Sequence, residues 1–143
     1  MTDTSLAVGL MSEILSADQT LKTKLSHHLP KGMELSHFSV LNHLASSNEK
    51  SPAQLARAFR VTKGAMTNTL KRLETAGHIH IRPDWDDARR KMVSISPAGL
   101  RARDIALNQL DAVFEAVIRD LGTDAIRQTL PVLRAFRSAL SDH

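Results

Sequence analysis

The chain has 143 residues, 42% of them hydrophobic and 24% charged, with a formal net charge of +4 and no cysteine. This length and apolar content are typical of a single folded domain and exclude a disordered tail. The missing cysteines exclude a disulfide scaffold, a thiolate zinc site and a thiol redox sensor, and the short apolar runs exclude a membrane span. We therefore expect a soluble cytoplasmic protein without a cleavable signal peptide.

The first predicted element is a long amphipathic helix over residues 4–29. Its apolar residues recur every three or four positions, which is the spacing of one helix face. These residues are Leu6, Leu10, Ile14, Ala17, Leu21, Leu25 and Leu29. Pro30 and Gly32 end this helix, and a second helix is predicted over residues 35–45.

Two short helices follow in the order of a helix-turn-helix. Ser51 is a predicted N-cap, because a proline suited to the first helical position comes directly after it. The helix that begins there runs to about Phe59. Thr62 is the predicted N-cap of the next helix, which covers residues 62–74. Two short helices joined by a turn of three or four residues form a helix-turn-helix.

A β-hairpin is predicted after the helix-turn-helix. Residues 78–82 alternate in hydropathy with a period of two, and residues 92–96 form a second extended run. The polar stretch between them, residues 83–91, is too long for a two-residue turn, so the hairpin carries an extended loop, or wing. So short a hairpin is marginal alone and must pack on the neighbouring helices.

Helical periodicity returns in residues 97–140, with a break at Gly122. The apolar faces of residues 4–29 and 97–140 are too extensive for the central module, residues 35–96, to cover. We therefore expect the terminal helices to pair with those of a second copy in a homodimer. The alternative is that they pack on the central module of their own chain. The predicted fold class is α+β, mostly α: a winged helix-turn-helix with N- and C-terminal dimerisation helices.

Basic residues gather in the central module. Residues 50–91 carry ten lysines and arginines against four acidic residues, whereas the rest of the chain has a small acidic excess. A basic centre between neutral or acidic flanks is the electrostatic footprint of a phosphate-binding module. A solvated helical face would show the same charge, so the charge alone does not decide between these alternatives.

The predicted helix over residues 62–74 has one apolar and one polar face. Met66, Leu70 and Leu73 lie three and four positions apart and should face the core. The opposite face is small, polar and basic, as in a helix that enters a DNA major groove; it comprises Lys63, Gly64, Thr67, Asn68 and Lys71. Asn68 could pair with adenine and Thr67 with a base edge, while Lys63, Lys71 and Arg72 suit phosphates. The alternative is an ordinary exposed helix face.

A dispersed motif runs from the end of this helix through the hairpin. Leu73-Glu74-x-x-Gly77 comes first, Asp87-x-Arg89 lies in the wing, and Ile95-Ser96 and Gly99 follow. In spacing and residue type the motif resembles the signature of the MarR family of winged helix-turn-helix transcription regulators. Four residues depart from the pattern of that family: His78, His80, Trp85 and Ala88.

The resemblance implies a homodimeric repressor that binds an inverted-repeat operator in double-stranded DNA. Residues 62–74 would lie in the major groove and the wing, residues 83–91, in the minor groove. Arg89 would enter the minor groove with Asp87 orienting its guanidinium, since a narrow A·T-rich groove attracts a cation. The DNA-binding residues expected are Ser51, Thr62, Lys63, Gly64, Thr67, Asn68, Lys71, Arg72, Asp87, Arg89 and Arg90.

The resemblance also implies control by a small molecule. A small, often anionic aromatic effector would bind between the dimerisation helices and the DNA-binding module and release the DNA. The candidate polar contacts of such an effector are Lys24, His28 and His37. The alternative is that these three are ordinary surface residues or satisfied core residues.

Other functions find less support in the residues. His78 and His80 would share one face of a strand, but no third ligand lies at a telling spacing, so we predict no metal and no cofactor. No glycine-rich phosphate loop, cysteine nucleophile or serine elbow indicates an enzyme. The main alternative function is a winged-helix adaptor that binds another protein and has no specific DNA site.

Overall fold

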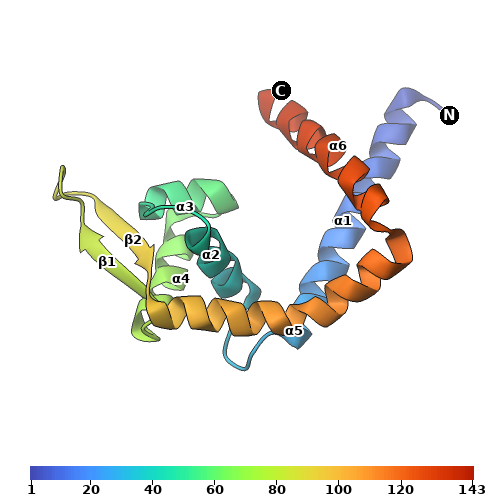
Figure 1. The fold of residues 1–143 in the computed structure, drawn as a ribbon. Coiled ribbons are helices and arrows are strands. Elements are labelled where there is room, and N and C mark those ends of the chain that lie inside the picture. The colour runs from blue at the N-terminus through green and yellow to red at the C-terminus, as the bar shows by residue number, and fades with distance from the viewer. The chain divides into compact units, whose positions relative to one another are not determined.

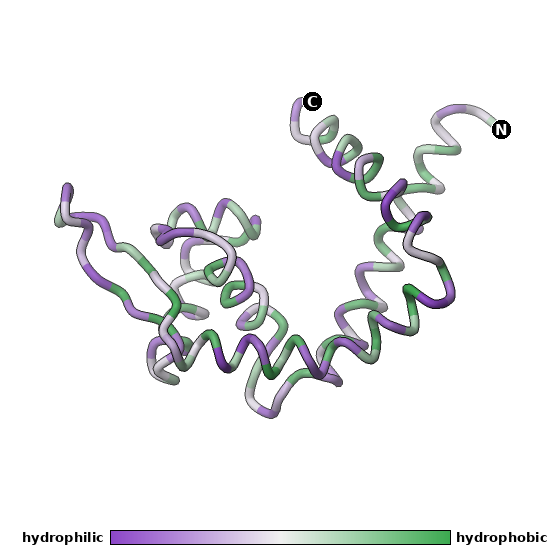
Figure 2. Tube along the Cα trace, viewed as in Figure 1, coloured by the Kyte–Doolittle hydropathy of each residue, from purple (hydrophilic) through white to green (hydrophobic).

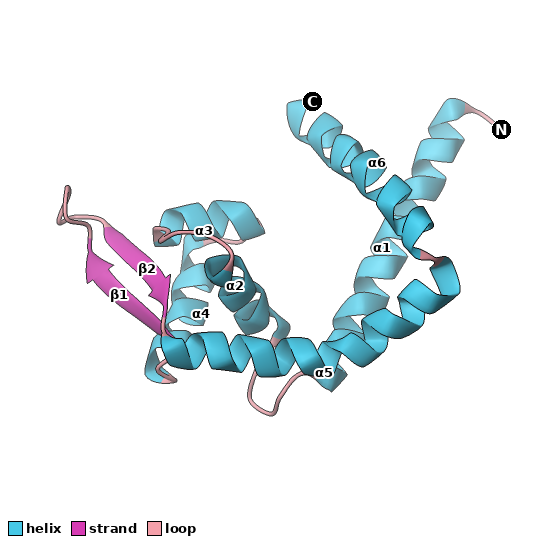
Figure 3. Cartoon of the chain, in the orientation of Figure 1, coloured by secondary structure: helices cyan, strands magenta, loops and turns pink.

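The computed structural model describes residues 1–143, and its elements follow the predicted order (Figures 1 and 3). The helices are α1 (Asp3–His28), α2 (Leu35–Ala45), α3 (Pro52–Phe59), α4 (Lys63–Thr75), α5 (Pro97–Leu121) and α6 (Thr123–Asp142). The strands are β1 (Ile79–Pro83) and β2 (Lys91–Ile95), which form an antiparallel hairpin. The predicted class, α+β and mostly α with a winged helix-turn-helix, is confirmed.

The chain divides into two compact units, Met1–Gln109 and Leu110–His143. The first unit contains α1, the helix-turn-helix, the hairpin and the first half of α5. The second contains the rest of α5 and α6. The predicted division by function, into dimerisation helices and a DNA-binding module, stays a prediction.

Local hydrogen bonds explain why α3 and α4 begin where they do. The Ser51 hydroxyl accepts from the Gln54 amide at 3.1 Å, and the Gln54 side chain accepts from the Ser51 amide at 2.8 Å. This reciprocal pair is a capping box. The Thr62 hydroxyl accepts from the Ala65 amide at 3.1 Å at the start of α4. Both predicted N-caps are confirmed, and each contributes about 1 kcal/mol.

One apolar core holds α2, α3, α4 and the hairpin together. Its members are Val40, Leu41, Leu44, Leu55, Ala56, Met66, Leu70, Leu73, Ile79 and Val93. Met66, Leu70 and Leu73 are at most 3% exposed, so the predicted apolar face of α4 is confirmed. Because each of these elements contributes to the core, the position of α4 relative to the hairpin is fixed by packing.

Both strands lie one residue away from their predicted positions. The ladder pairs Ile79 with Ile95 and Pro83 with Lys91, so β1 covers 79–83 and β2 covers 91–95. His78 is outside β1 because its amide donates to the Leu73 carbonyl and closes the end of α4. Ser96 is outside β2 because its carbonyl accepts from Leu100 at the start of α5. The loop at the tip of the hairpin is therefore residues 84–90, shorter than predicted.

A close approach between the hairpin and α5 requires a glycine. A Cβ atom added at Gly99 would overlap the His78 carbonyl oxygen and press on the Ile95 side chain. The Ser96 hydroxyl strengthens this junction, since it donates to the Gly77 carbonyl at 2.6 Å and accepts from the Gly99 amide at 3.0 Å. The glycine of the sequence motif is thus a packing requirement of the fold.

Hydrophobic residues recur along both terminal helices, where the trace is green in Figure 2, and many of their large side chains are exposed. No residue of α1 or α6 is buried. The exposed apolar residues of α1 include Leu6, Val8, Leu10, Met11, Leu15 and Leu21, and those of α6 include Leu130, Val132, Leu133 and Leu140. None of the helices combines the length and the hydropathy that crossing a membrane requires.

Candidate nucleic-acid interface

The face of α4 opposite the core is open to solvent. Lys63, Gly64, Thr67, Asn68 and Lys71 are all exposed, as is the cap residue Thr62. A Cβ atom at Gly64 would meet nothing within 4 Å, so the packing of the chain does not require a glycine there. A glycine inside a helix costs about 0.5–1 kcal/mol relative to alanine. Its presence fits a face that another molecule approaches closely.

Ser51 and Arg72, two of the predicted DNA-binding residues, have contacts within the chain; the Ser51 cap was predicted, and the Arg72 contact was not. Ser51 is only 6% exposed and its hydroxyl caps α3, so its role in the fold is structural. Arg72 pairs with Glu34, at the N-cap of α2, with 3.1 Å between Nη1 and Oε1. Direct DNA contact by these two residues stays a prediction; it is less favoured for Ser51, whose hydroxyl is buried and already bonded, whereas the Arg72 side chain is 58% exposed and has further donors.

The loop at the tip of the hairpin is closed by its own backbone and carboxylates. The Asp84 amide donates to the Arg90 carbonyl, and the Arg90 amide donates to the Asp87 carbonyl, both at 2.9 Å. The Asp86 amide donates to the Asp84 carboxylate at 3.1 Å. These bonds restrict the loop, so the side chains at its tip project from a defined backbone.

Arg89 projects from this loop with one carboxylate beside it. Its side chain is 91% exposed, and its Nε lies 3.1 Å from Oδ1 of Asp87. The Arg89 amide donates to the same oxygen at 3.1 Å. The hydrogen bonds from Arg89 hold the pKa of the Asp87 carboxyl below its usual value. Asp87 is therefore ionised at neutral pH and lies against the guanidinium; the minor-groove role that the resemblance implies for this pair stays a prediction.

Arg90 has a weaker contact of the same kind. Its Nε lies 3.9 Å from Oδ2 of Asp84, and about half of its side chain is exposed. The guanidinium thus keeps free donors for a further anion, because it offers five and this contact uses at most one or two.

Trp85 packs against Arg82, a contact that the sequence did not predict. The residue is 81% exposed, and the guanidinium carbon of Arg82 lies 4.5 Å from the centre of its ring. Arg82 also donates to Glu49 at 2.6 Å and to the Pro83 carbonyl at 2.8 Å. Glu49 precedes α3, so this contact fixes the base of the wing to the helix-turn-helix.

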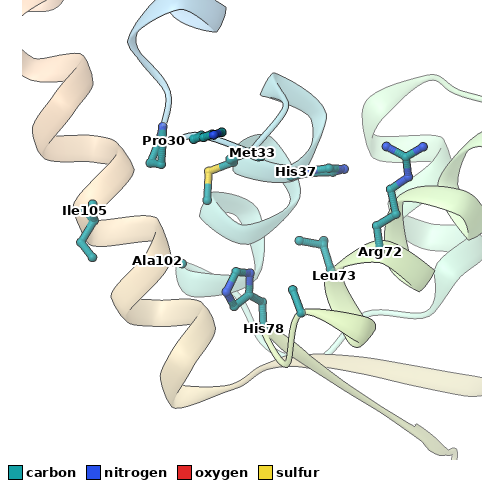
Figure 4. A pocket seen from close by; sticks show the side chains of 11 residues that line it. Pro30, Met33, His37, Arg72, Leu73, His78, Ala102 and Ile105 are labelled. Carbon is teal, nitrogen blue, oxygen red and sulfur yellow. The ribbon is translucent and has the colours of Figure 1, made fainter.

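A pocket of about 410 Å³ lies within the first unit, between the segment before α2, the end of α4 and the start of α5 (Figure 4). It is lined by Pro30, Lys31, Gly32, Met33, His37, Arg72, Leu73, Ala76, His78, Ala102 and Ile105. Of the three predicted effector contacts, only His37 lies here. Lys24 and His28 lie on exposed turns of α1, where Nδ1 of His28 is bonded to the Lys24 carbonyl at 2.9 Å.

His37 is the most buried polar residue of this pocket. It is 7% exposed, and its Nδ1 accepts a hydrogen bond from the Glu34 amide at 3.2 Å as part of the capping box of α2. Burial lowers the pKa of His37, Glu34 partly offsets this, and Arg72 and His78 lower it further. The imidazole is therefore neutral at pH 7, which its role as a hydrogen-bond acceptor also requires.

Curated relatives resemble this chain over most of its length. The MarR family profile matches residues 31–90. The HTH-type transcriptional repressor Rv2887 of Mycobacterium tuberculosis is 37% identical over 112 residues, which are 78% of this chain and 75% of that protein. The transcriptional activatory protein BadR of Rhodopseudomonas palustris is 26% identical over 107 residues, which are 72% of this chain and 61% of that protein.

Solved structures share the fold. A cysteine-to-serine mutant of MarR from E. coli, in complex with operator DNA, superposes with a TM-score of 0.80 at 20% identity, covering 95% of this chain and 99% of that one. BpsR of Bordetella bronchiseptica, whose DNA binding is regulated by 6-hydroxynicotinic acid, gives a TM-score of 0.78 at 15% identity, with 90% and 98% covered.

Proposed function

This chain belongs to the MarR family of transcription regulators, and we propose that it binds an inverted-repeat operator as a homodimer. The observation that carries the proposal is the pairing of two exposed features in one compact unit. The first is the polar and basic face of α4. The second is the wing tip, where Asp87 positions Arg89. Helices of this kind enter the major groove, and an arginine on an adjacent extended loop suits the minor groove.

The role of each exposed side chain follows from its chemistry. Asn68 and Thr67 can read base edges, while Lys63, Lys71 and Arg90 neutralise phosphates and fix the register. Thr62 would offer the N-terminus of α4 to a phosphate, because the first amides of a helix attract anions. None of these roles involves catalysis, so we propose a regulator that is not an enzyme.

The uncovered apolar faces of α1 and α6 support a dimer. Each of these two helices leaves several large apolar side chains exposed, and exposed apolar patches often mark protein–protein interfaces. A two-fold dimer would bury these faces and present two copies of α4 to successive major grooves. The two half-sites would then lie about 10 bp apart, centre to centre.

Repression is the sign of regulation we favour. The relative with 37% identity is a repressor, whereas the one with 26% identity is an activatory protein. A dimer on an operator that overlaps a promoter blocks polymerase sterically and needs no further contact surface. Activation would need such a surface on the same dimer.

We place the effector in the pocket beside α4, with a small aromatic carboxylate as its chemical class. His37, Arg72 and His78 supply nitrogen donors for a carboxylate, and Met33, Leu73 and Ile105 supply apolar walls. The volume of about 410 Å³ is sufficient for one aromatic ring with its substituents. BpsR, which shares the fold, is regulated in its DNA binding by 6-hydroxynicotinic acid, a compound of this chemical class.

Fluorescence anisotropy with labelled DNA tests the function. The probe is a fluorescein-labelled duplex from upstream of the chain's own coding sequence, and the control is a scrambled duplex of equal composition. We expect preference for the upstream duplex and an affinity that falls linearly with salt on logarithmic axes. Equal binding to both duplexes, or no dependence on salt, would favour the adaptor function instead.

A further inference from the structure

Trp85 and Arg89 both belong to the loop at the tip of the wing, residues 84–90. The strand register pairs Pro83 with Lys91, and the hydrogen bond from the Asp84 amide to the Arg90 carbonyl extends the same register by one step. Beyond that step the ladder ends in a turn, because the Arg90 amide donates to the Asp87 carbonyl; Trp85 lies before this turn and Arg89 within it. They are also the two large side chains of this loop with the greatest exposure, 81% and 91%.

The orientation of Trp85 is set by a chain of contacts. The ring packs on the guanidinium of Arg82, and Arg82 is held by Glu49 at 2.6 Å. One face of the indole is thus occupied by a cation, and its remaining surface is open to solvent. An exposed tryptophan leaves a large apolar surface in water, which burial against another molecule would remove. Apart from Arg82, the chain leaves the ring uncovered, and 81% of the residue is exposed.

We propose that Trp85 is a DNA-contacting residue that packs on the sugar edge of the minor groove beside the Arg89 insertion. This inference rests on the proposed DNA-binding function and adds an apolar contact to it. Aromatic side chains can stack on the faces of bases, and proteins that bind the minor groove frequently insert apolar side chains there. A dimer would make this contact twice, once with the wing of each protomer.

The charge of the loop explains why such a contact is useful. Asp84 and Asp87 pair with Arg90 and Arg89, and Asp86 adds a further negative charge. Residues 84–90 therefore carry three carboxylates against two guanidinium groups, a net charge of −1, so the loop as a whole does not attract phosphates. An apolar side chain gives the wing affinity that does not depend on counterion release. Loss of Trp85 and loss of Arg89 should therefore differ in their dependence on salt.

The test uses the fact that Trp85 is the single tryptophan of a chain without tyrosine. The full-length protein is titrated with the labelled upstream duplex, while tryptophan emission and DNA anisotropy are recorded on the same samples. Acrylamide quenching is then measured with and without DNA. We expect DNA binding to shield the indole from acrylamide, in step with the rise in anisotropy. The Trp85→Phe variant controls for the origin of the emission.

Affinity measurements on variants complete the test. We expect Trp85→Ala to weaken operator binding on the order of tenfold with an unchanged salt slope and melting temperature. Trp85→Phe should retain most of the affinity, and Arg89→Gln should reduce the slope. Anisotropy that rises while the indole stays accessible would overturn the inference and leave the function intact. If DNA changes neither the anisotropy nor the acrylamide quenching, the proposed function itself is contradicted.

Discussion

At the scale of single residues, exposure separates the binding residues from the structural ones. Arg89 is 91% exposed and contacts only Asp87, so its side chain contributes little to folding. Gly99 lies against the His78 carbonyl, so its lack of a side chain matters to folding alone. Both residues belong to the same sequence motif, yet their substitution should affect different measurements.

Arg89→Ala should weaken specific DNA binding and leave stability unchanged. The expected loss is about 1–3 kcal/mol for each arginine that leaves the groove. The measurement is operator affinity by anisotropy, paired with the melting temperature by circular dichroism. Unchanged affinity in a folded variant would remove Arg89 from the interface.

Two glycine substitutions should act in opposite directions. Gly99→Ala places a methyl group against backbone, which costs about 1–3 kcal/mol of unfolding free energy. Gly64→Ala meets nothing in the chain and should raise stability by about 0.5–1 kcal/mol through helix propensity. We expect the same Gly64→Ala change to reduce DNA affinity, because the methyl group lies on the face that approaches DNA. Urea denaturation and anisotropy measure the two effects; a Gly64→Ala variant with full affinity would place the contact elsewhere on α4.

At the scale of elements, the features that could be predicted are those determined by residues close together in the sequence. The starts of α3 and α4 followed from Ser51 and Thr62, because an N-cap acts within three residues. The strand ends were wrong by one residue, because they are set by His78 and Ser96 bonding to other elements. The Arg72–Glu34 and Arg82–Glu49 contacts join residues 38 and 33 positions apart. The periodicity of a helix or strand relates only residues close in sequence, so these contacts could not be predicted from it. For the same reason the predicted effector contacts matched this pocket only at His37, since its walls come from three segments far apart in the sequence.

The capping box of α2 should make stability depend on pH. Burial lowers the pKa of His37, so between its folded value and 6.5 the unfolded chain binds a proton that the folded chain does not. The contribution is fully present above pH 6.5 and is lost as pH falls through the folded pKa. Three neighbouring groups act on the charge of the imidazole. Glu34 favours its protonated form, whereas Arg72 and His78 disfavour it.

His37→Gln tests this dependence. Glutamine can still accept the bond from the Glu34 amide at this position of a capping box, but it does not titrate. We expect the unfolding free energy of the variant to decline less between pH 7.5 and pH 5.5 than that of the parent chain, in urea titrations at matched ionic strength. Identical pH profiles would exclude His37 as the group responsible.

At the scale of the whole molecule, the apolar faces of the terminal helices dominate the expected behaviour. Leu15 of α1 is 60% exposed in the single chain, so a charge there would not disturb the packing of that chain. In a dimer that buries this face, Leu15→Glu should weaken the association of the two protomers at least several-fold. The operator affinity should fall with it. Sedimentation velocity over a range of concentrations measures the association. Ser16→Glu, with the same charge one position along, is the matched control; equal behaviour of both variants would exclude this face from the interface.

The pocket also has a thermodynamic consequence. Arg72, Leu73 and Ala76 line it, and all three belong to the last turn of α4 or its cap. If a ligand there lowers the affinity for DNA, then DNA must lower the affinity for that ligand by the same factor, because the two couplings share one free energy. Ligand binding measured on the free protein would then overstate occupancy on the chromosome. In the cell, the operator itself would set the ligand concentration at which the regulator responds.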